Sequence, residues 1–242
     1  RAKVRSLAMA TRQGKASAWD ALNRRICRCR SCPRLIAHCQ KTAVDKKAAF
    51  RDDTYWGGPV PNFGDPAARV LVVGLAPAAH GANRTGRMFT GDRSGDWLYR
   101  GLHKAGFATQ AESTARDDGL RLVDCAITAA AHCAPPGNKP LPEELAECQR
   151  GLEQRIDALP VRVFLALGQI AWRATIVEAR RRQWHDGRIP KFGHGATVML
   201  AGDRWLVGSY HPSQQNTFTG VLTERMFDAA LRTVRRKLAG AC

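Results

Sequence analysis

The sequence predicts an α/β protein: a three-layer α/β/α domain around a central, mainly parallel, four-stranded sheet. Four nearly continuous apolar runs rich in β-branched residues are typical of strands buried on both faces. Helical patterns separate these runs, and strands that alternate with helices form parallel sheets covered on both faces. The predicted strands are residues 69–75, 120–128, 161–167 and 205–209.

Helices are predicted between and after these strands, at residues 94–107, 142–159, 169–182 and 223–238. The first begins at Ser94, a residue type that caps helices well, and ends near Gly106. Near the end of the chain, residues 197–200 and 205–207 are separated by a turn that contains Gly and Asp. This pattern predicts a hairpin at one edge of the sheet.

The first 50 residues differ from the rest in pattern and charge. They have no clean apolar period apart from a possible amphipathic helix around residues 19–26. Residues 1–51 hold 14 Lys and Arg against two acidic residues, so most of the net charge of +17 lies there. We therefore predict a basic N-terminal extension (1–50) that carries the first cysteine pair, followed by one α/β/α domain (51–242).

A surplus of this size favours a polyanionic partner through long-range attraction and counterion release. Nucleic acid is the first expectation, an anionic membrane surface the second, and a merely solubilising tail the third. No apolar run approaches the roughly 20 residues that span a bilayer, and the start of the chain lacks the pattern of a signal peptide. We expect a soluble, cytoplasmic, nucleoid-associated monomer that does not bind membranes.

Eight cysteines are many for a chain without an export signal. In a reducing compartment such cysteines are more often metal ligands than disulfides. Cys29 and Cys32 form a C-x2-C pair, and Cys133 and Cys148 form a C-x14-C pair. A short and a long pair can close a four-thiolate site for zinc or an iron–sulfur cluster.

The spacing alone leaves alternatives open. Cys133 and Cys148 could be buried small hydrophobes, and Cys27 and Cys39 compete with the short pair as ligands. Cys125 lies within a predicted strand and is expected in the core. Cys242 ends the sequence and is expected to take no part.

Ligands of open α/β sheets bind beyond the carboxyl ends of the strands, which selects the loops 76–91, 129–140 and 210–220. Residues 74–91 include four glycines, so backbone amides there can approach a ligand closely. Neither a phosphate-loop pattern nor G-x-G-x-x-G occurs, which argues against nucleotide-cofactor enzymes. In the last loop, His211 directly follows a strand and could donate a hydrogen bond to an anion formed in a transition state.

Four segments together resemble the uracil-DNA glycosylase superfamily, and within it family 5, the B-type iron–sulfur enzymes. GLAPAAHGANRTGRMFTGD resembles the first family motif and HPSQQNTFTG the second, while CAPPGNKP and CRSCPRL resemble cluster-binding segments. These matches occur in order across residues 29–220. The resemblance implies a monofunctional DNA glycosylase that flips uracil out of double-stranded DNA and hydrolyses its N-glycosidic bond in base-excision repair. Hypoxanthine and xanthine are implied as further substrates.

The resemblance also implies a structural [4Fe–4S] cluster without a redox step in catalysis. Its ligands would be Cys29, Cys32, Cys133 and Cys148, whereas Cys27 and Cys39 match no ligand.

By the same resemblance, His211 is the donor to the oxygen of the departing base, and Phe89 stacks on that base. Gln214 and Gln215 would support the flipped state from the minor groove. The remaining predicted substrate-binding residues are Gly74, Leu75, Ala76, Pro77, Ala78, Ala129 and Ser213.

One departure from the wider superfamily concerns the attacking water. Many members carry an acidic or amide side chain in the first motif, where this sequence has Leu-Ala-Pro-Ala. Asn83 and His80 are the candidate catalytic residues for orienting the water, and Asp92 is a third that could instead cap the following helix. Ala129 stands where family 4 has an Asn that reads the uracil edge, so looser base recognition is expected.

Two other classes of protein remain as alternatives. A non-catalytic iron–sulfur protein of the same fold would bind nucleic acid, although the intact loop around His211 argues against it. A zinc-dependent nucleic-acid hydrolase would use the same cysteines. Visible absorbance by the purified protein would indicate an iron–sulfur cluster, and bound zinc would indicate the hydrolase.

Overall fold

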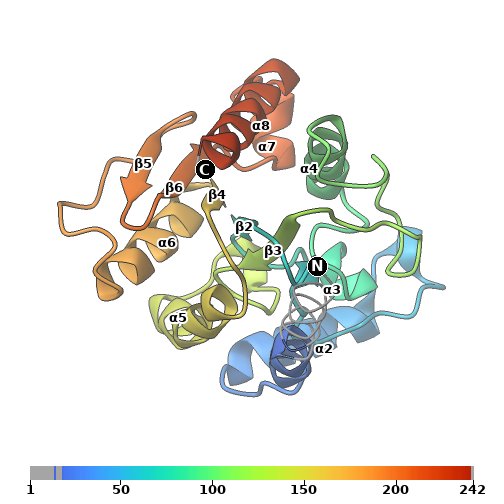
Figure 1. The fold of residues 1–242 in the computed structure, drawn as a ribbon. Helices are drawn as coiled ribbons and strands as arrows, with labels where there is room; N and C mark the ends of the chain where they lie inside the picture. Colours follow the sequence, from blue (N-terminus) through green and yellow to red (C-terminus); the bar gives the residue numbers. More distant parts are fainter. Residues whose placement is uncertain (1–13, 15–17, 241–242) are drawn as a thin grey trace, which may run out of the picture.

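The protein is described by a computed structural model that covers residues 14 and 18–240, in which helices cover both faces of a central sheet (Figure 1). The sheet has six strands in the order β1-β3-β2-β4-β6-β5. The strands are β1 (Phe63–Gly64), β2 (Val70–Gly74), β3 (Cys125–Ala129), β4 (Val163–Leu167), β5 (Thr197–Leu200) and β6 (Arg204–Ser209).

The predicted α/β class and its four parallel strands are confirmed, because β3, β2, β4 and β6 pair in parallel. The sheet is nevertheless six-stranded rather than four-stranded. The predicted hairpin adds β5 antiparallel to β6, and β1 adds to the other edge. Strand β1 was not predicted, because its two residues lie in a segment rich in Gly and Pro.

Strand β3 is shorter than predicted. It begins at Cys125 rather than at residue 120, because Asp124 has a φ of 54°, which no extended strand can accommodate. Leu122 before it forms an isolated bridge with Ala108 instead. Cys125 itself is fully buried in the core, as the sequence predicted.

The two faces of the sheet carry separate cores. The alternate residues Val70 and Val72 of β2 pack with helices α4 (Arg93–Lys104) and α8 (Glu224–Ala239). Leu71 and Val73 face the opposite way and pack with helices α5 (Pro142–Asp157) and α6 (Gln169–Arg181). Because every residue of β2 is buried, the continuous apolar run that predicted this strand is explained.

Helix α4 is capped by Asp92, so the predicted cap at Ser94 is wrong and the alternative cap at Asp92 is confirmed. Asp92 has the extended backbone of an N-cap residue, and its carboxylate accepts a hydrogen bond from the Gly95 amide at 3.0 Å. Ser94 already lies inside the first turn. This leaves the Asp92 side chain fixed at the end of the loop that follows β2.

The N-terminal segment contributes two helices that flank the cysteine-rich region. Residues 18–27 are helical, as predicted, and bury Trp19 and Leu22 in the core shared with α5 and α6. Helix α2 (Pro33–Asp45) follows. Residues 1–13 of the predicted basic extension, residues 15–17 and Cys242 lie outside the described residues. Among residues 18–240, no helix is both long and apolar enough to cross a membrane.

Several short helices lie outside the predicted helices, most of them in predicted loops. They are η1 (Ala48–Phe50), α3 (Ala82–Thr85), η2 (Pro136–Asn138) and α7 (Gln214–Phe218). Of these, α3 and α7 lie in the two glycine- and amide-rich loops that were expected to carry the chemistry.

Candidate active site

A cavity of about 420 Å³ lies at the carboxyl end of the parallel strands and joins residues from all three loops selected from the sequence. Its walls are Leu75, Ala76, Pro77, Ala78, Met88, Phe89, Asp92, Ser94, Gly137, Asn138, Lys139, His211, Ser213 and Gln215. Much of the wall that follows β2 is formed by small or apolar residues. A ligand there would meet backbone groups more often than charged side chains.

Eight of the predicted site residues line this cavity: Leu75, Ala76, Pro77, Ala78, Phe89, His211, Ser213 and Gln215. Gly74 and Ala129 lie just behind the wall. Ala129 is 1% exposed, and a side chain at Gly74 would come within 2.8 Å of the Phe89 ring. Gln214 is exposed at the start of α7 and does not line the cavity.

The two predicted catalytic candidates from the first loop point elsewhere. Asn83 is fully buried, and its amide donates to the carbonyls of Cys39 and Ala79. The ring of His80 hydrogen-bonds to the hydroxyl of Tyr55 at 3.0 Å. Neither residue is part of the cavity wall.

His211 presents a free imidazole to the cavity. The Asn216 amide holds the backbone carbonyl of His211 at 2.9 Å, and the imidazole stacks on Phe89 with 5.8 Å between ring centroids. None of the described residues hydrogen-bonds to its ring nitrogens. Burial lowers the pKa of His211 to about 4 because the imidazolium would lose hydration. The ring is therefore neutral at neutral pH and offers one N–H donor.

Phe89 is held in an uncommon backbone conformation, with a φ of 54°. A bulky residue adopts this conformation only where its surroundings enforce it. Gly95 makes room for the loop, because a Cβ at this position would lie 1.8 Å from the Phe89 carbonyl oxygen. No local sequence pattern marks Gly95, since the close approach joins a helix to a preceding loop.

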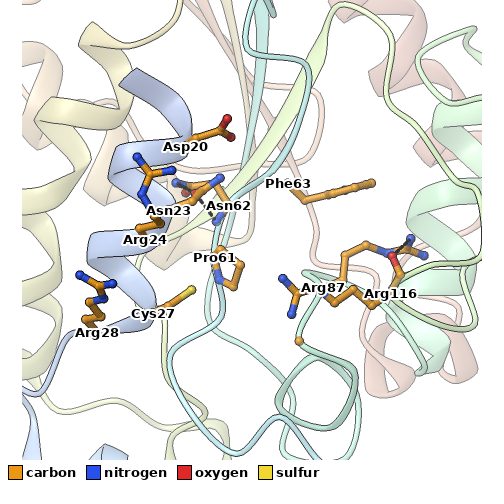
Figure 2. Close-up of a pocket in the computed structure, with 11 residues that line it drawn as sticks. Asp20, Asn23, Arg24, Cys27, Arg28, Pro61, Asn62, Phe63, Arg87 and Arg116 are labelled. Atoms are coloured by element: carbon orange, nitrogen blue, oxygen red, sulfur yellow. Dashed lines mark hydrogen bonds between the residues drawn. The ribbon is translucent and has the colours of Figure 1, made fainter. Parts of the chain in front are cut away.

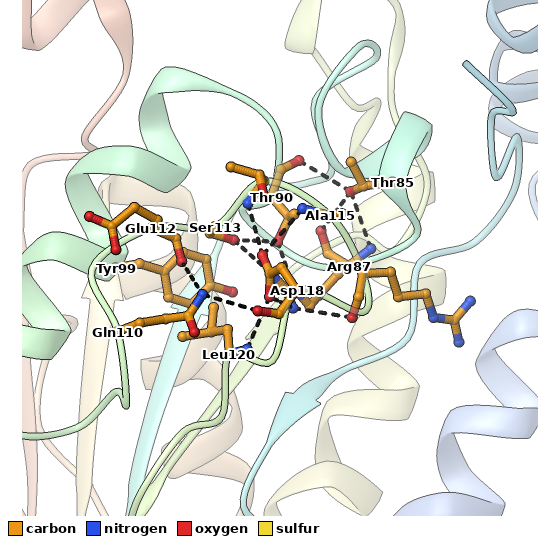
Figure 3. A network of polar contacts seen from close by, with 12 residues as sticks. Thr85, Arg87, Thr90, Tyr99, Gln110, Glu112, Ser113, Ala115, Asp118 and Leu120 are labelled. Carbon is orange, nitrogen blue, oxygen red and sulfur yellow. Dashed lines mark hydrogen bonds and ion pairs between the residues drawn. The ribbon is translucent and has the colours of Figure 1, made fainter. Parts of the chain in front are cut away.

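A buried ion pair fixes the same loop (Figure 3). The guanidinium of Arg87 makes two hydrogen bonds to the Asp118 carboxylate, at 2.8 and 2.6 Å, and further bonds to Thr90 and Ser113. The Arg87 and Asp118 side chains are only 3% and 10% exposed. Burial would raise the pKa of Asp118, but Arg87 and three backbone amides hold it well below its usual range. The pair ties the segment before Phe89 to the long excursion between α4 and β3.

Replacing Asp118 with alanine should lower the free energy of unfolding by about 3–5 kcal/mol, because the Arg87 charge would remain buried without its partner. Denaturant titration at neutral pH measures this loss. Asp45→Ala is the matched control, since its pair with Lys41 is far more exposed and should contribute about 1 kcal/mol or less. Equal losses in the two variants would contradict the role given to the buried pair.

Asp92 supplies the one carboxylate among the described residues that line the cavity. One of its oxygens caps α4, and the other faces Gly81, where a Cβ would lie 1.9 Å from it. Burial raises the pKa of Asp92, and backbone hydrogen bonds from Gly95 and Ser94 offset part of this rise. Its fixed position makes it a better candidate for holding a water molecule than the sequence suggested.

A second, largely apolar cavity of about 110 Å³ is lined by Cys29, Cys32, Cys133 and Cys148. These four thiols come from the segment before α2, the loop after β3 and helix α5. Burial raises the pKa of Cys32 to about 11, and the neighbouring Cys148 adds to this rise. Thiolates packed together in this way repel one another unless a cation lies between them.

Within residues 18–240, no three metal-binding side chains converge on the position of a single ion. Four thiols around one hollow are nevertheless a donor set that fits an iron–sulfur cluster, and four-cysteine zinc sites use the same set. Cys27 and Cys39 are not part of the wall. Cys39 lies buried behind it, where its sulfur accepts a hydrogen bond from the Ala134 amide.

Residues 61–235 match the uracil DNA glycosylase superfamily. The α/β fold and the cavity at the strand ends are thus those of a member of this enzyme superfamily. The type-5 uracil-DNA glycosylase of Thermus thermophilus is 52% identical over 214 residues, covering 88% of this chain and 94% of the relative. The type-5 enzyme of Mycobacterium tuberculosis is 48% identical over 229 residues, covering 94% and 84%.

A type-4 uracil-DNA glycosylase of Pyrobaculum aerophilum is more distant, at 32% identity over 181 residues that cover 74% of this chain and 80% of the relative. The chain belongs to the type-5 uracil-DNA glycosylases. This confirms the family expected from the loop motifs, and with it the expectation of a glycosylase enzyme.

Proposed function

We propose that this protein excises uracil from double-stranded DNA by hydrolysing the N-glycosidic bond, as a step of base-excision repair. The type-5 relatives carry the name of this activity. The observation that carries the proposal is the neutral imidazole of His211, which faces the cavity with no hydrogen-bond partner among the described residues. A donor in this state can stabilise a pyrimidine anion as it leaves.

The target base has to leave the duplex before it can enter the cavity, at a cost of a few kcal/mol that is smallest for a mismatched base. Bond breaking then moves negative charge onto the departing base. The His211 N–H and the backbone amides of residues 75–79 are the groups that would receive this charge. Phe89, already stacked on His211, would provide an aromatic surface for the flipped base.

A pocket made largely of backbone and apolar side chains suits more than one base. Ala129 offers no side-chain amide to read the uracil edge and is itself buried behind the wall. Hypoxanthine and xanthine are therefore proposed as additional substrates. Gln214, exposed at the start of α7, and Gln215, in the cavity wall, are the proposed residues that support the opened duplex.

Asp92 is the proposed group for holding the attacking water. Asp92→Asn should lower the single-turnover excision rate about 10- to 100-fold, because the amide keeps the helix cap but is a much weaker base. In the unmodified enzyme the rate should fall as the pH drops through the raised pKa of Asp92. Rapid-quench measurements from pH 4 to 8 test both effects. An unchanged rate for the Asn variant would show that Asp92 does not hold the attacking water. Asn83 and His80 would then be the remaining candidates for this role.

A groove of about 470 Å³ beside the N-terminal helix is the proposed contact for the DNA backbone (Figure 2). Arg24 and Arg28 lie on its helical side, and Arg87 and Arg116 lie opposite them. Arg87 is neutralised by Asp118, whereas the other three arginines form no ion pair with any residue in the described range. The Arg116 guanidinium lies over the Trp56 ring, 4.6 Å from its centroid, and keeps its charge. Guanidinium groups without a carboxylate partner on both sides of a groove suit a phosphodiester.

Arg24→Gln with Arg28→Gln should weaken duplex binding and reduce the slope of log affinity against log salt by about 2, since each phosphate contact contributes about 1. Fluorescence anisotropy over a salt series measures the slope. Arg173→Gln, on the exposed face of α6, removes a charge outside the groove and is the matched control. A slope that is insensitive to the groove substitutions would place the DNA elsewhere.

The four-cysteine cavity is the proposed site of a structural [4Fe–4S] cluster, with Cys29, Cys32, Cys133 and Cys148 as ligands. When bound, such a group supplies structural cross-linking between the N-terminal segment, the β3 loop and α5. The chain's own residues perform the hydrolysis.

A strand-cleavage assay with alkali work-up tests the proposed activity. Duplexes with a single U·G pair should be cut at the uracil after treatment, and duplexes with hypoxanthine or xanthine should be cut more slowly. A protein that binds these duplexes but leaves no alkali-labile site would be a non-catalytic binder, and the proposed function would be wrong.

A further inference from the structure

Arg155 on helix α5 buries a guanidinium group among neutral acceptors. Its side chain is 2% exposed. It donates hydrogen bonds to the carbonyls of Gly151, Cys148 and Ala129, to the hydroxyl of Thr128 and to the ring of His132. The His132 ring accepts from Arg155 at Nε2 and donates from Nδ1 to the Val60 carbonyl, which is the hydrogen bonding of a neutral imidazole.

No carboxylate forms an ion pair with Arg155 anywhere in residues 18–240. Glu178 attracts the charge from farther away, but its carboxylate is already paired with Arg181 and Arg182. Transferring an unpaired ion from water to a protein interior is strongly unfavourable, even where neutral groups hydrogen-bond to it. A fold that keeps such a charge needs a negative group nearby.

The same guanidinium forms part of the wall of the four-cysteine cavity. Its Nη2 atom donates to the Cys148 carbonyl at 2.6 Å, so it contacts one of the proposed cluster ligands directly. Gly151 makes room for it, because a Cβ there would lie 3.0 Å from Nη2. A glycine inside a helix is less stable than an alanine there, and the missing Cβ at Gly151 leaves space that the Arg155 guanidinium uses.

A cluster bound by four thiolates carries net negative charge, and it would supply the close counter-charge that no ion pair among residues 18–240 provides. We propose that Arg155 is the buried counter-cation of the iron–sulfur cluster and that it holds the end of strand β3 against the cluster. This inference rests on the proposed cluster. It makes Arg155 a positioning residue.

The contacts of Arg155 lead from the cluster cavity to the base pocket. Its Nη1 atom donates to the Ala129 carbonyl at 3.0 Å. The next two residues, Ala130 and Ala131, donate from their amides to the carbonyls of Gly74 and Leu75, both at 2.9 Å. Leu75 lines the active-site cavity. Arg155 thus joins the cluster to the backbone that forms the wall of the base pocket.

The test compares the cluster in the holoenzyme with that in Arg155→Gln and Arg155→Lys, purified without air. Gln keeps a hydrogen-bond donor but removes the charge, whereas Lys keeps the charge. Reduction adds negative charge to the cluster, so a nearby cation raises its reduction potential. Arg155→Gln should therefore shift the potential to a more negative value and speed oxidative bleaching of the visible absorbance. Arg155→Lys should stay near the unmodified protein.

Arg87→Gln is the matched control, because Arg87 is buried to a similar degree but has Asp118 as its partner and lies outside the cluster cavity. It should destabilise the fold and leave the potential unchanged. An unchanged potential in Arg155→Gln, or equal shifts in the Gln and Lys variants, would overturn the inference. So would a failure of both variants to fold while iron-free unmodified protein folds. If the unmodified protein contains no iron, the proposed cluster itself is wrong. This result differs from an unchanged reduction potential, which would contradict only the role of Arg155.

Discussion

His211→Ala should lower the single-turnover rate of uracil excision about 10²- to 10³-fold while duplex affinity stays nearly the same. Removing one preorganised donor from a site of developing charge costs this much in other enzymes. His211 lies in the cavity wall, its ring has no competing partner among the described residues, and burial keeps it neutral. The substitution would therefore remove a hydrogen bond that forms in the transition state, so it would lower the excision rate and not the affinity for the duplex.

Rapid-quench kinetics with enzyme in excess give the rate, and anisotropy gives the affinity. Gln214→Ala is a useful comparison, because Gln214 is in the same loop but outside the cavity wall and should affect duplex binding more than bond breaking. Since the pKa of His211 is lowered to about 4, no titration of this residue should appear in the rate near pH 6.5. Full excision by His211→Ala would remove the leaving-group role.

Cys133→Ser should remove most of the bound iron and strongly reduce the yield of folded protein. A serine hydroxyl does not replace a thiolate ligand of an iron–sulfur cluster, and the remaining three thiols would surround an unfilled apolar cavity. Iron content, visible absorbance and thermal unfolding of the purified variant measure the effect.

Cys39→Ser is the matched control for this substitution. Cys39 is fully buried near Cys133, and its sulfur accepts from the Ala134 amide at 3.2 Å, but it does not line the cavity. It should keep its iron and lose about 1–2 kcal/mol of stability, as expected of a small change at a buried position. The reverse pattern, with iron lost from Cys39→Ser and kept by Cys133→Ser, would reassign the ligand.

The parallel sheet could be predicted because its signal is local. Each inner strand is a short apolar run followed by a helical pattern, and residues such as Val70 to Val73 are apolar whichever face they occupy. The weaker elements could not be predicted in this way. Strand β1 has two residues and exists only because Phe63 and Gly64 pair with Ile127 and Ala126. Ser94 and Asp92 are both good capping residues, so the sequence left both as candidates for the helix cap. The backbone path, which is extended at Asp92, makes Asp92 the cap.

For the site too, some features could be predicted from the sequence and others could not. The loops after β2 and β6 could be selected because ligands of such sheets bind at the strand ends. The direction of each side chain could not. Asn83 turns towards Cys39, His80 towards Tyr55, and Asp92 towards the cavity, and all three belong to neighbouring stretches of one loop. The pairing of Arg87 with Asp118 and the burial of Arg155 have no local signal, because their partners are distant in sequence.

The sequence by itself determined the α/β class, the loops at the strand ends and the family motifs, since periodicity and residue type depend on near neighbours along the chain. The tertiary structure alone decided which polar groups are buried and what they face. These properties depend on contacts between distant segments, and burial changes the free energy of a charge far more than its neighbours in sequence do.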